Sequence, residues 1–400
     1  MVATLASSSF LGNKLLNGIF RHGERTVDPT TLYPTDPYIN EKYYPYGVGQ
    51  LTNAGKIREY NIGKALRKRY DNFLGKIYEP DILDALSTDF NRTKMSLELV
   101  LAGLFPPVGD QIFEPGLYWQ PIPYNFLPRN QDKLLLGILC PNYKKFYARL
   151  TKSKKLQRDY YEHRDLFKYL SVNSGWNISD YNDIFYLYFG LRSEKEWGFE
   201  LPEWTNMVYP QPLEDLSISG YHLQKIIEDT KAKITGALKP SKRKIFLYSC
   251  HESNIANFLT TLDVFEPQIP PYGCYILVEV HKIEGVYGIK VSRLIPIRTF
   301  LTIYQIDIFN DNELTKSGYN YGIHGDPEEA IFMEQTEGFI KPGEHLLATL
   351  RNLCIYYQDY IGDGPKLLKL PACDAFCPLD KFIALTEEYI PAIDSCGRDE

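Results

Sequence analysis

The stretch KLLNGIFRHGER, residues 14–25, combines an apolar run with a charged cluster that follows it directly. Its apolar part predicts a buried strand, and the charged residues would then lie at the carboxyl end of that strand. Residues 81–92, DILDALSTDFNR, and residues 245–252, IFLYSCHE, repeat the same order. Apolar residues at helical spacing follow both repeats, over 93–105 and 255–262, and predict a helix in each place.

Strands that lead into helices are typical of an α/β fold, in which helices cover both faces of a mostly parallel sheet. Ligands of such sheets bind outside the carboxyl ends of the strands, which is where all three charged clusters fall. Residues 51–74 predict an amphipathic helix with Ile57 and Ile62 on its apolar stripe. Its basic residues, at 64 and 67–69, lie mostly off that stripe and are expected to be solvated.

The middle of the chain has a different pattern. Residues 116–238 lack the strand-to-helix order and contain Pro-rich turns and aromatic stretches. We interpret them as a mainly helical cap lobe that is inserted into the α/β core and covers a site at the strand ends. The core would then be discontinuous, with residues 14–115 and 239–396.

Composition narrows the class of protein. The 400 residues carry a formal net charge of −6, which argues against a protein that binds nucleic acid through a basic surface. Hydrophobic residues make up 44% and aromatic residues 14% of the chain, which is too much for a disordered protein. No apolar run has the length of a transmembrane helix. We therefore expect a globular protein, and its length favours a large domain with a second lobe.

The charged clusters have the composition of a phosphate site. Arginine guanidinium groups match phosphate oxygens bidentately and keep their charge at any relevant pH. Nearby positive charge would keep the imidazole of His22 neutral and nucleophilic. Gly23 is expected to let the backbone approach a ligand closely. His251 and Glu252 would add a second phosphate ligand and a proton donor.

Each cluster also has a purely structural interpretation when it is taken alone. The Arg21-His22 pair could be solvated in a loop, and His251-Glu252 could cap a helix. Arg92 could pair with a local carboxylate such as Asp89. Three strand ends that together supply three arginines, two histidines and a glutamate nevertheless favour a single site.

Seven motifs follow one another in a fixed order: RHGERT (21–26), YPTDP (33–37), GQLTNAG (49–55), STDFNRT (87–93), LFPP (104–107), WQPIP (119–123) and LPACDAFCPL (370–379). They resemble those of the histidine acid phosphatases, the larger branch of the histidine phosphatase superfamily. The resemblance is greatest to animal acid phosphatases of the prostatic, lysosomal and insect secreted (venom or salivary) type. It extends over residues 14–290 and 355–396.

The resemblance implies an acid phosphatase that hydrolyses phosphate monoesters through a phosphohistidine on His22, with Glu252 as proton donor. The phosphate ligands would be Arg21, Arg25, Arg92 and His251. Neither a metal nor a cofactor is implied, because the arginines supply the positive charge. The partner would be a small phosphate monoester, without nucleic acid or a membrane span, and a homodimer stays open. Two alternatives also stay open: a phosphatase selective for inositol phosphates or lysophospholipids, and a catalytically weak secreted binding protein on the same scaffold.

Three features depart from the family pattern. Glu252 stands where the family usually has aspartate, and Val27 stands where a proline usually closes the first motif. The longer acid reaches one methylene further, and we expect a local change of turn at Val27. Residues 285–290 and 355–360 resemble two consecutive parts of one strand of the family. Residues 291–354, which separate them in this chain, therefore have no counterpart in the family pattern.

The cysteines and sequons bear on the cellular compartment. The chain has seven cysteines, and Cys373 and Cys377 are close enough in sequence for a small disulfide loop. The resemblance implies the disulfides Cys373–Cys377 and Cys140–Cys396, and it leaves Cys250, Cys274 and Cys354 over. We expect Cys250 to be a buried apolar residue and not a catalytic thiol. The sequons at Asn91 and Asn177 are glycosylation candidates. Secretion or a lysosomal location follows from the resemblance, although residues 1–20 do not predict a convincing signal peptide.

Overall fold

The computed structural model describes residues 13–139, 151–209, 223–265, 269–294, 366–373 and 376–387, together with residues 145 and 148–149. These residues belong to one compact unit, which takes in the chain up to Ile295 and from Pro365 onward. Residues 296–364 lie outside the described part. Within that part, no helix is long and apolar enough to cross a membrane.

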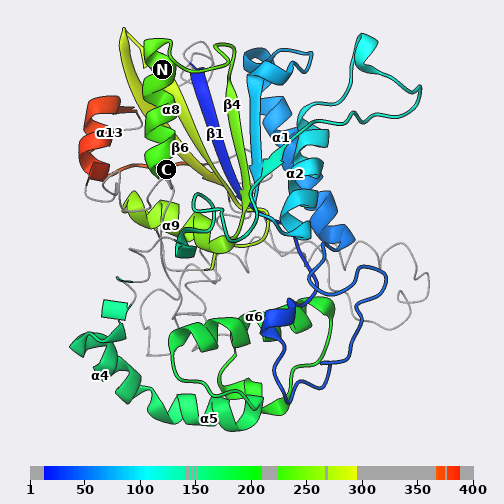
Figure 1. Ribbon diagram of the computed structural model, residues 1–400, viewed down its shortest axis with the longest axis vertical. Coiled ribbons are helices and arrows are strands. Elements are labelled where there is room, and N and C mark those ends of the chain that lie inside the picture. The colour runs from blue at the N-terminus through cyan, green and yellow to red at the C-terminus, as the bar shows by residue number, and fades with distance from the viewer. Residues whose placement is uncertain are drawn as a thin grey trace, which may run out of the picture. The chain divides into compact units, whose positions relative to one another are not determined.

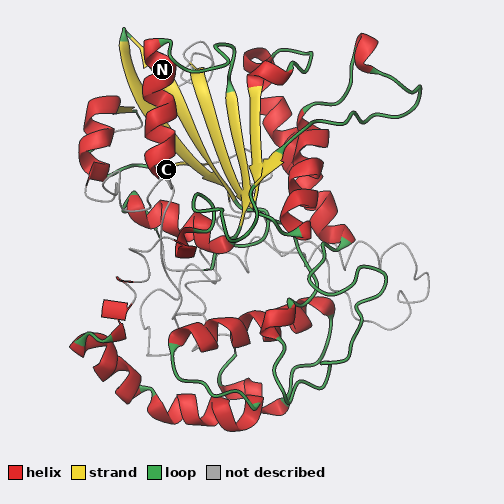
Figure 2. Ribbon diagram, viewed as in Figure 1, coloured by secondary structure: helices red, strands yellow, loops and turns green. Residues whose placement is uncertain are grey.

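One sheet, drawn in yellow in Figure 2, forms the core of the described residues. Its strand order is β3-β2-β4-β1-β5-β6-β7, and β8 pairs with β6. The parallel strands are β1 (Asn13–Arg21), β2 (Leu83–Ser87), β3 (Asn125–Phe126) and β4 (Ile245–Cys250). The strands added in antiparallel orientation are β5 (Tyr275–Ile283), β6 (Val286–Leu294), β7 (Lys366–Leu367) and β8 (Cys377–Pro378). The predicted α/β class is confirmed, and its three predicted strands, β1, β2 and β4, are the parallel neighbours at the centre.

Helices cover both faces of this sheet, as the sequence predicts (Figure 1). On one face α1 (Asn53–Leu74) and α2 (Asn91–Leu104) pack on alternate strand residues such as Leu16 and Leu247. On the other face α8 (Leu223–Thr235), α9 (Glu252–Thr261) and α13 (Leu379–Thr386) pack on residues such as Ile19 and Phe246. The strands of the centre are therefore apolar on both sides, which explains their continuous apolar runs.

The buried face of α1 differs from the predicted stripe. Ile62 is buried as expected, but Ile57 is 58% exposed. The cause is the close contact between α1 and α2, since a Cβ on Gly63 would lie 2.2 Å from the carbonyl oxygen of Val100. This approach of the two backbones fixes the rotation of α1, and Gly63 gives no apolar signal in a helical pattern.

The basic face of α1 is solvated only in part, because Lys64 and Lys68 are exposed as expected whereas Arg67 and Arg69 are half-buried and bind groups of the protein. Arg69 forms an ion pair with the buried carboxylate of Glu279 at 2.9 Å. Arg67 donates to the carbonyl oxygens of Asp71 and Gly75 at the end of the helix. Both contacts serve the structure of the core and lie outside the charged clusters of the strand ends.

A third group of helices packs around its own apolar cluster. It contains α4 (Lys154–Glu162), α5 (Arg164–Ser174) and α6 (Tyr181–Trp197), with Leu170 and Leu187 at its centre. Asp180 caps the start of α6, and Gly198 ends the helix in a left-handed conformation. The limits predicted for a cap lobe, 116–238, stay a prediction. Within that range β3 belongs to the sheet and α8 packs on it.

The strand β6 runs to Leu294, four residues beyond the point where the family resemblance ends, and Ser292 pairs with Leu367 of β7. The predicted continuation at 355–360 lies outside the described residues. A disulfide joins Cys373 to Cys377. Cys140, Cys354 and Cys396 lie outside the described residues, so the pairing Cys140–Cys396 stays a prediction.

Candidate active site

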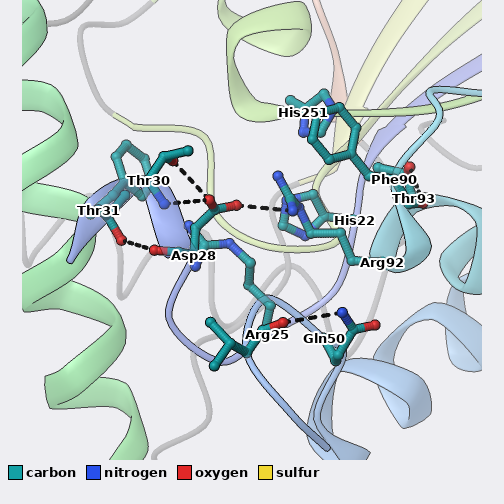
Figure 3. A network of polar contacts seen from close by, with 12 residues as sticks. His22, Arg25, Asp28, Thr30, Thr31, Gln50, Phe90, Arg92, Thr93 and His251 are labelled. Carbon is teal, nitrogen blue, oxygen red and sulfur yellow. Dashed lines mark hydrogen bonds and ion pairs between the residues drawn. The ribbon is translucent and has the colours of Figure 1, made fainter. Parts of the chain in front are cut away.

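Three parallel strands, β2, β4 and β1, end at the same edge of the sheet. His22 directly follows β1, His251 directly follows β4, and Arg92 lies in the first turn of α2, which begins after β2. Figure 3 shows these three side chains together with Arg25. The strand ends thus gather charged residues that are far apart in the sequence.

The imidazole of His22 is held through both of its nitrogens, and the residue is 1% exposed. Nδ1 lies 2.8 Å from the carbonyl oxygen of Gly23, and the Nε–H of Arg92 donates to Nε2 at 3.2 Å. Because a carbonyl oxygen can only accept, we assign the ring proton to Nδ1, and Nε2 carries the lone pair that accepts the hydrogen bond from Arg92. Burial and the guanidinium groups of Arg92 and Arg21 hold the pKa of His22 well below its usual value.

Gly23 lies in close contact with the two helices that cover this end of β1. A Cβ at this position would lie 2.6 Å from the carbonyl oxygen of Gly55 in the first turn of α1. The Gly23 N–H donates to the hydroxyl of Ser96 on α2 at 3.2 Å. Close packing against the helices therefore requires glycine at this position, and the expected approach of a ligand to its backbone stays a prediction.

Arg21 and Glu252 form a buried ion pair beside His22. The Nε atom of Arg21 lies 3.0 Å from Oε2 of Glu252, and its Nη1–H donates to the carbonyl oxygen of Pro270 at 2.6 Å. The guanidinium lies 4.0 Å from the ring centroid of Tyr272, as in a cation–π contact. Burial alone would raise the pKa of Glu252, but Arg21 overrides this effect and lowers the pKa to about 2.

Arg92 is held by Asp28 and not by Asp89. Its Nη1 atom lies 3.0 Å from Oδ2 of Asp28, whereas Asp89 pairs with Lys94. The guanidinium also stacks on the Phe90 ring, 4.6 Å from its centroid. Burial, followed by the charge of Arg25, lowers the pKa of Arg92 to about 10, so the group stays charged in acid solution.

Arg25 connects the site to the helical group. Its Nη1–H donates to the carbonyl oxygen of Thr26 at 2.8 Å and to Oγ of Ser193 on α6 at 3.1 Å. Its Nε atom is buried and has no hydrogen-bond partner among the described residues. A buried, charged donor without a partner fits a site that accepts an anion.

His251 caps a helix, as the structural interpretation of its motif predicts, and its ring also lies beside His22. It is the N-cap residue of α9, where its backbone N–H donates to the Asn254 side chain at 3.0 Å. Its Nε2 atom lies 3.0 Å from the hydroxyl of Thr88. The centroids of the His251 and His22 imidazole rings are 5.6 Å apart. Burial and the charge of Arg92 lower the pKa of His251 to about 3, so this ring is neutral in the free protein.

The structure also brings residues to the site that the sequence analysis missed. They are Asp28, Phe90, Ser193 and Tyr272. Asp28 precedes Pro29 and caps the short 3-10 helix η2 (Pro29–Thr31), and an Asp-Pro pair is a helix-start signal that could have drawn attention to it. Tyr272 lies in the loop before β5. Since β5 is antiparallel to β1, it begins at the edge where β1 ends.

The sequence of the chain is similar to those of known phosphatases. The family model of the histidine phosphatase superfamily (branch 2) matches residues 9–169. A venom acid phosphatase of Apis mellifera is 32% identical over 396 residues, which cover 95% of this chain and 86% of the relative. The prostatic acid phosphatase of Homo sapiens is 33% identical over 301 residues, which cover 70% of this chain and 76% of the relative.

A solved structure of Hafnia alvei phytase in complex with myo-inositol hexakis sulphate superimposes with a TM-score of 0.55 at 15% identity. The match covers 96% of this chain and 98% of the phytase chain, and it shows a common fold. The chain belongs to branch 2 of the histidine phosphatase superfamily and is a phosphatase.

Proposed function

We propose that this phosphatase is an acid phosphatase that hydrolyses phosphate monoesters in two steps, through a phosphohistidine on His22. The observation that carries the proposal is the state of the His22 imidazole. Its proton sits on Nδ1, and its Nε2 lone pair faces a guanidinium that can hold a phosphate oxygen. A neutral imidazole surrounded by fixed positive charge is a suitable nucleophile for a phosphoryl group.

In the first step Nε2 of His22 attacks phosphorus, and the bond between phosphorus and the ester oxygen breaks. The departing alcohol takes a proton from the carboxyl group of Glu252. In the second step water attacks phosphorus and the bond between phosphorus and Nε2 breaks. One proton of the water passes to Glu252, and inorganic phosphate leaves. The carbonyl oxygen of Gly23 accepts from Nδ1–H throughout and stabilises the imidazole when it becomes cationic.

The phosphate oxygens would be held by Arg21, Arg25, Arg92 and His251. Three guanidinium groups offset the negative charge of the transferring phosphoryl group, which is the main need of this reaction. The neutral ring of His251 can donate one hydrogen bond, and its pKa would rise when an anion binds beside it. No step of this scheme needs a metal ion.

The ionisation of Glu252 connects the mechanism to acid pH. In the free protein Arg21 keeps this carboxyl ionised, so it has no proton to donate. A bound phosphate ester offsets the charge of Arg21 and raises the pKa of Glu252 again. The proton can arrive with the substrate, because a phosphate monoester is a monoanion below about pH 6.

Hydrolysis of p-nitrophenyl phosphate by the wild type and by His22→Ala tests this function. We expect the variant to lose at least about 1000-fold in kcat/KM, because the nucleophile is absent. His163→Ala is a matched control, since His163 lies in the helical group and contacts Asp159 and Tyr181 instead of the site. Equal rates for wild type and His22→Ala would refute the proposal.

We also propose that the protein is secreted or lysosomal and carries glycans. Asn91 and Asn177 are both exposed, as glycosylation requires. The name of the Apis mellifera relative, a venom acid phosphatase, supports the secreted location. A shift in electrophoretic mobility after glycosidase treatment that is smaller in the Asn177→Gln variant than in the wild type would report the glycan at that position. A homodimer stays a prediction.

A further inference from the structure

Four buried polar side chains meet outside the phosphate site, where the loop of residues 26–50 packs on α6. We call Tyr33, Asp36, Tyr43 and Glu194 the acid cluster, and none of them is more than 3% exposed. Oδ2 of Asp36 and the hydroxyl of Tyr43 have no hydrogen-bond partner among the described residues, and the hydroxyl of Tyr33 interacts with the carboxyl group of Glu194. Buried polar atoms without partners are rare, and a cluster of them calls for a physical reason.

The acid cluster contains two carboxyl groups without a counter-charge. Tyr33, Asp36 and Tyr43 of the loop face Glu194, and Tyr38 and Glu41 face the two tyrosines. On the helix itself, the neighbouring cation Arg192 is paired with Glu196 at 2.8 Å. Within the described residues no cation forms an ion pair with either carboxyl group. Two buried carboxylates cannot both ionise there at low cost.

Protonation resolves this conflict in acid solution. Burial, with a contribution from the Asp36 carboxylate, raises the pKa of Glu194 to about 8. Burial also raises the pKa of Asp36. Protonation of Glu194 removes the charge repulsion between the two carboxyl groups, and the protonated carboxyl can donate a hydrogen bond to a tyrosine oxygen.

The acid cluster lies next to contacts of the phosphate site. Ser193, which precedes Glu194 on α6, accepts the hydrogen bond from Arg25 at 3.1 Å. The loop carries Asp28, which pairs with Arg92 at 3.0 Å. Loop and helix touch at the backbone as well, since a Cβ on Gly190 would lie 2.4 Å from the carbonyl oxygen of Thr31. A separation of loop and helix would therefore move two phosphate-binding guanidinium groups.

We propose that Glu194 and Asp36 are positioning residues whose protonation in acid solution holds the loop of residues 26–50 against α6. In acid solution this contact keeps Arg25 and Arg92 in place for the phosphate. When the proton is lost at higher pH, repulsion between the two carboxylates loosens the contact and weakens phosphate binding. The inference rests on the proposed function and adds a pH control to the same site.

Glu194 should make the stability of the fold depend on pH, because the folded and unfolded states bind its proton with different affinity. The folded protein binds the proton of Glu194 more tightly than the unfolded chain does, because the pKa is about 8 in the fold against an ordinary value of 4.5. The stabilisation is therefore complete below pH 4.5 and is lost as the pH rises through about 8. Glu194→Gln, which is neutral at every pH, should remove this dependence.

The test compares the pH dependence of KM and kcat for p-nitrophenyl phosphate in wild type, Glu194→Gln and Asp36→Asn, between about pH 4 and pH 9. We expect KM of the wild type to rise with pH. In acid, the KM of both variants should lie within about twofold of the wild-type value. At the alkaline end, it should be at least about fivefold lower than that of the wild type. The matched control is Glu203→Gln, which removes an exposed carboxyl from the short 3-10 helix η6 (Glu203–Met207) that follows α6. Profiles of both variants that coincide with the wild type would overturn the proposal.

Tryptophan fluorescence provides a readout that does not depend on catalysis. Trp197 contacts Tyr43 at 5.2 Å between ring centroids, and Trp204 contacts Tyr33 at 6.1 Å. A pH titration of the emission should show a transition in the wild type and in Glu203→Gln that is absent in Glu194→Gln. The same transition in all three proteins would contradict the proposal.

If the wild type has no phosphatase activity, the proposed function fails while this titration still decides the role of the acid cluster. If Glu194→Gln does not fold, Asp36→Asn decides it.

Discussion

At the scale of single residues, the His22 imidazole is fixed on one side by a carbonyl oxygen and on the other by a guanidinium. The residues that the sequence assigns to the phosphate site all gather here, because each motif ends a parallel strand or begins the helix after it. Asp28 and Tyr272 could not be found in this way. Asp28 comes from a loop, and Tyr272 precedes an antiparallel strand, so neither follows a predicted strand end.

Glu252→Gln tests the proton donor at this scale. A good leaving group such as p-nitrophenolate departs without a proton, whereas an alkyl alkoxide needs one. We expect a loss of roughly 100-fold for an alkyl phosphate and of less than about tenfold for p-nitrophenyl phosphate. Values of kcat/KM for the two substrates, which report the first step alone, measure the difference, with Glu203→Gln as the control for loss of a carboxylate elsewhere. Equal slowing for the two substrates would remove Glu252 from the acid role.

At the scale of elements, the loop that follows β1 does more than connect two elements. Its ends are tied together, since Thr26 N–H donates to the carbonyl oxygen of Gln50 and Gly49 N–H to that of Val27. Between these ties the loop presents Asp28 to Arg92. The sequence predicts the strand and the helix around this loop. It does not predict the contact of the loop with α6, because that contact joins residues of two separate apolar patterns.

Asp28→Asn tests whether this loop positions Arg92. Without the carboxylate, the guanidinium loses the partner that sets its orientation toward His22. We expect KM for p-nitrophenyl phosphate to rise by roughly tenfold, with a smaller change in kcat. Asp89→Asn is the matched control, because Asp89 pairs with Lys94 and should leave KM unchanged. A larger effect of the Asp89 variant than of the Asp28 variant would refute the positioning role.

At the scale of the whole molecule, the net charge of −6 conceals a local concentration of positive charge. Three guanidinium groups and two neutral imidazoles share one edge of the sheet, and attraction of the substrate is therefore local to that edge. Family patterns predict this site well because strand order brings the motifs together. They say little about the rotation of α1, which depends on the glycine contact between α1 and α2.

The central claim is that His22 carries the phosphoryl group between the two steps. Rapid mixing with a radiolabelled phosphate monoester in acid, followed by quenching in alkali, preserves a phosphoramidate because that bond is stable to base. The account predicts label on the peptide that contains His22 and its release when that peptide is treated with acid. Turnover of the substrate without any label on the protein, or with label on a residue other than His22, would contradict it.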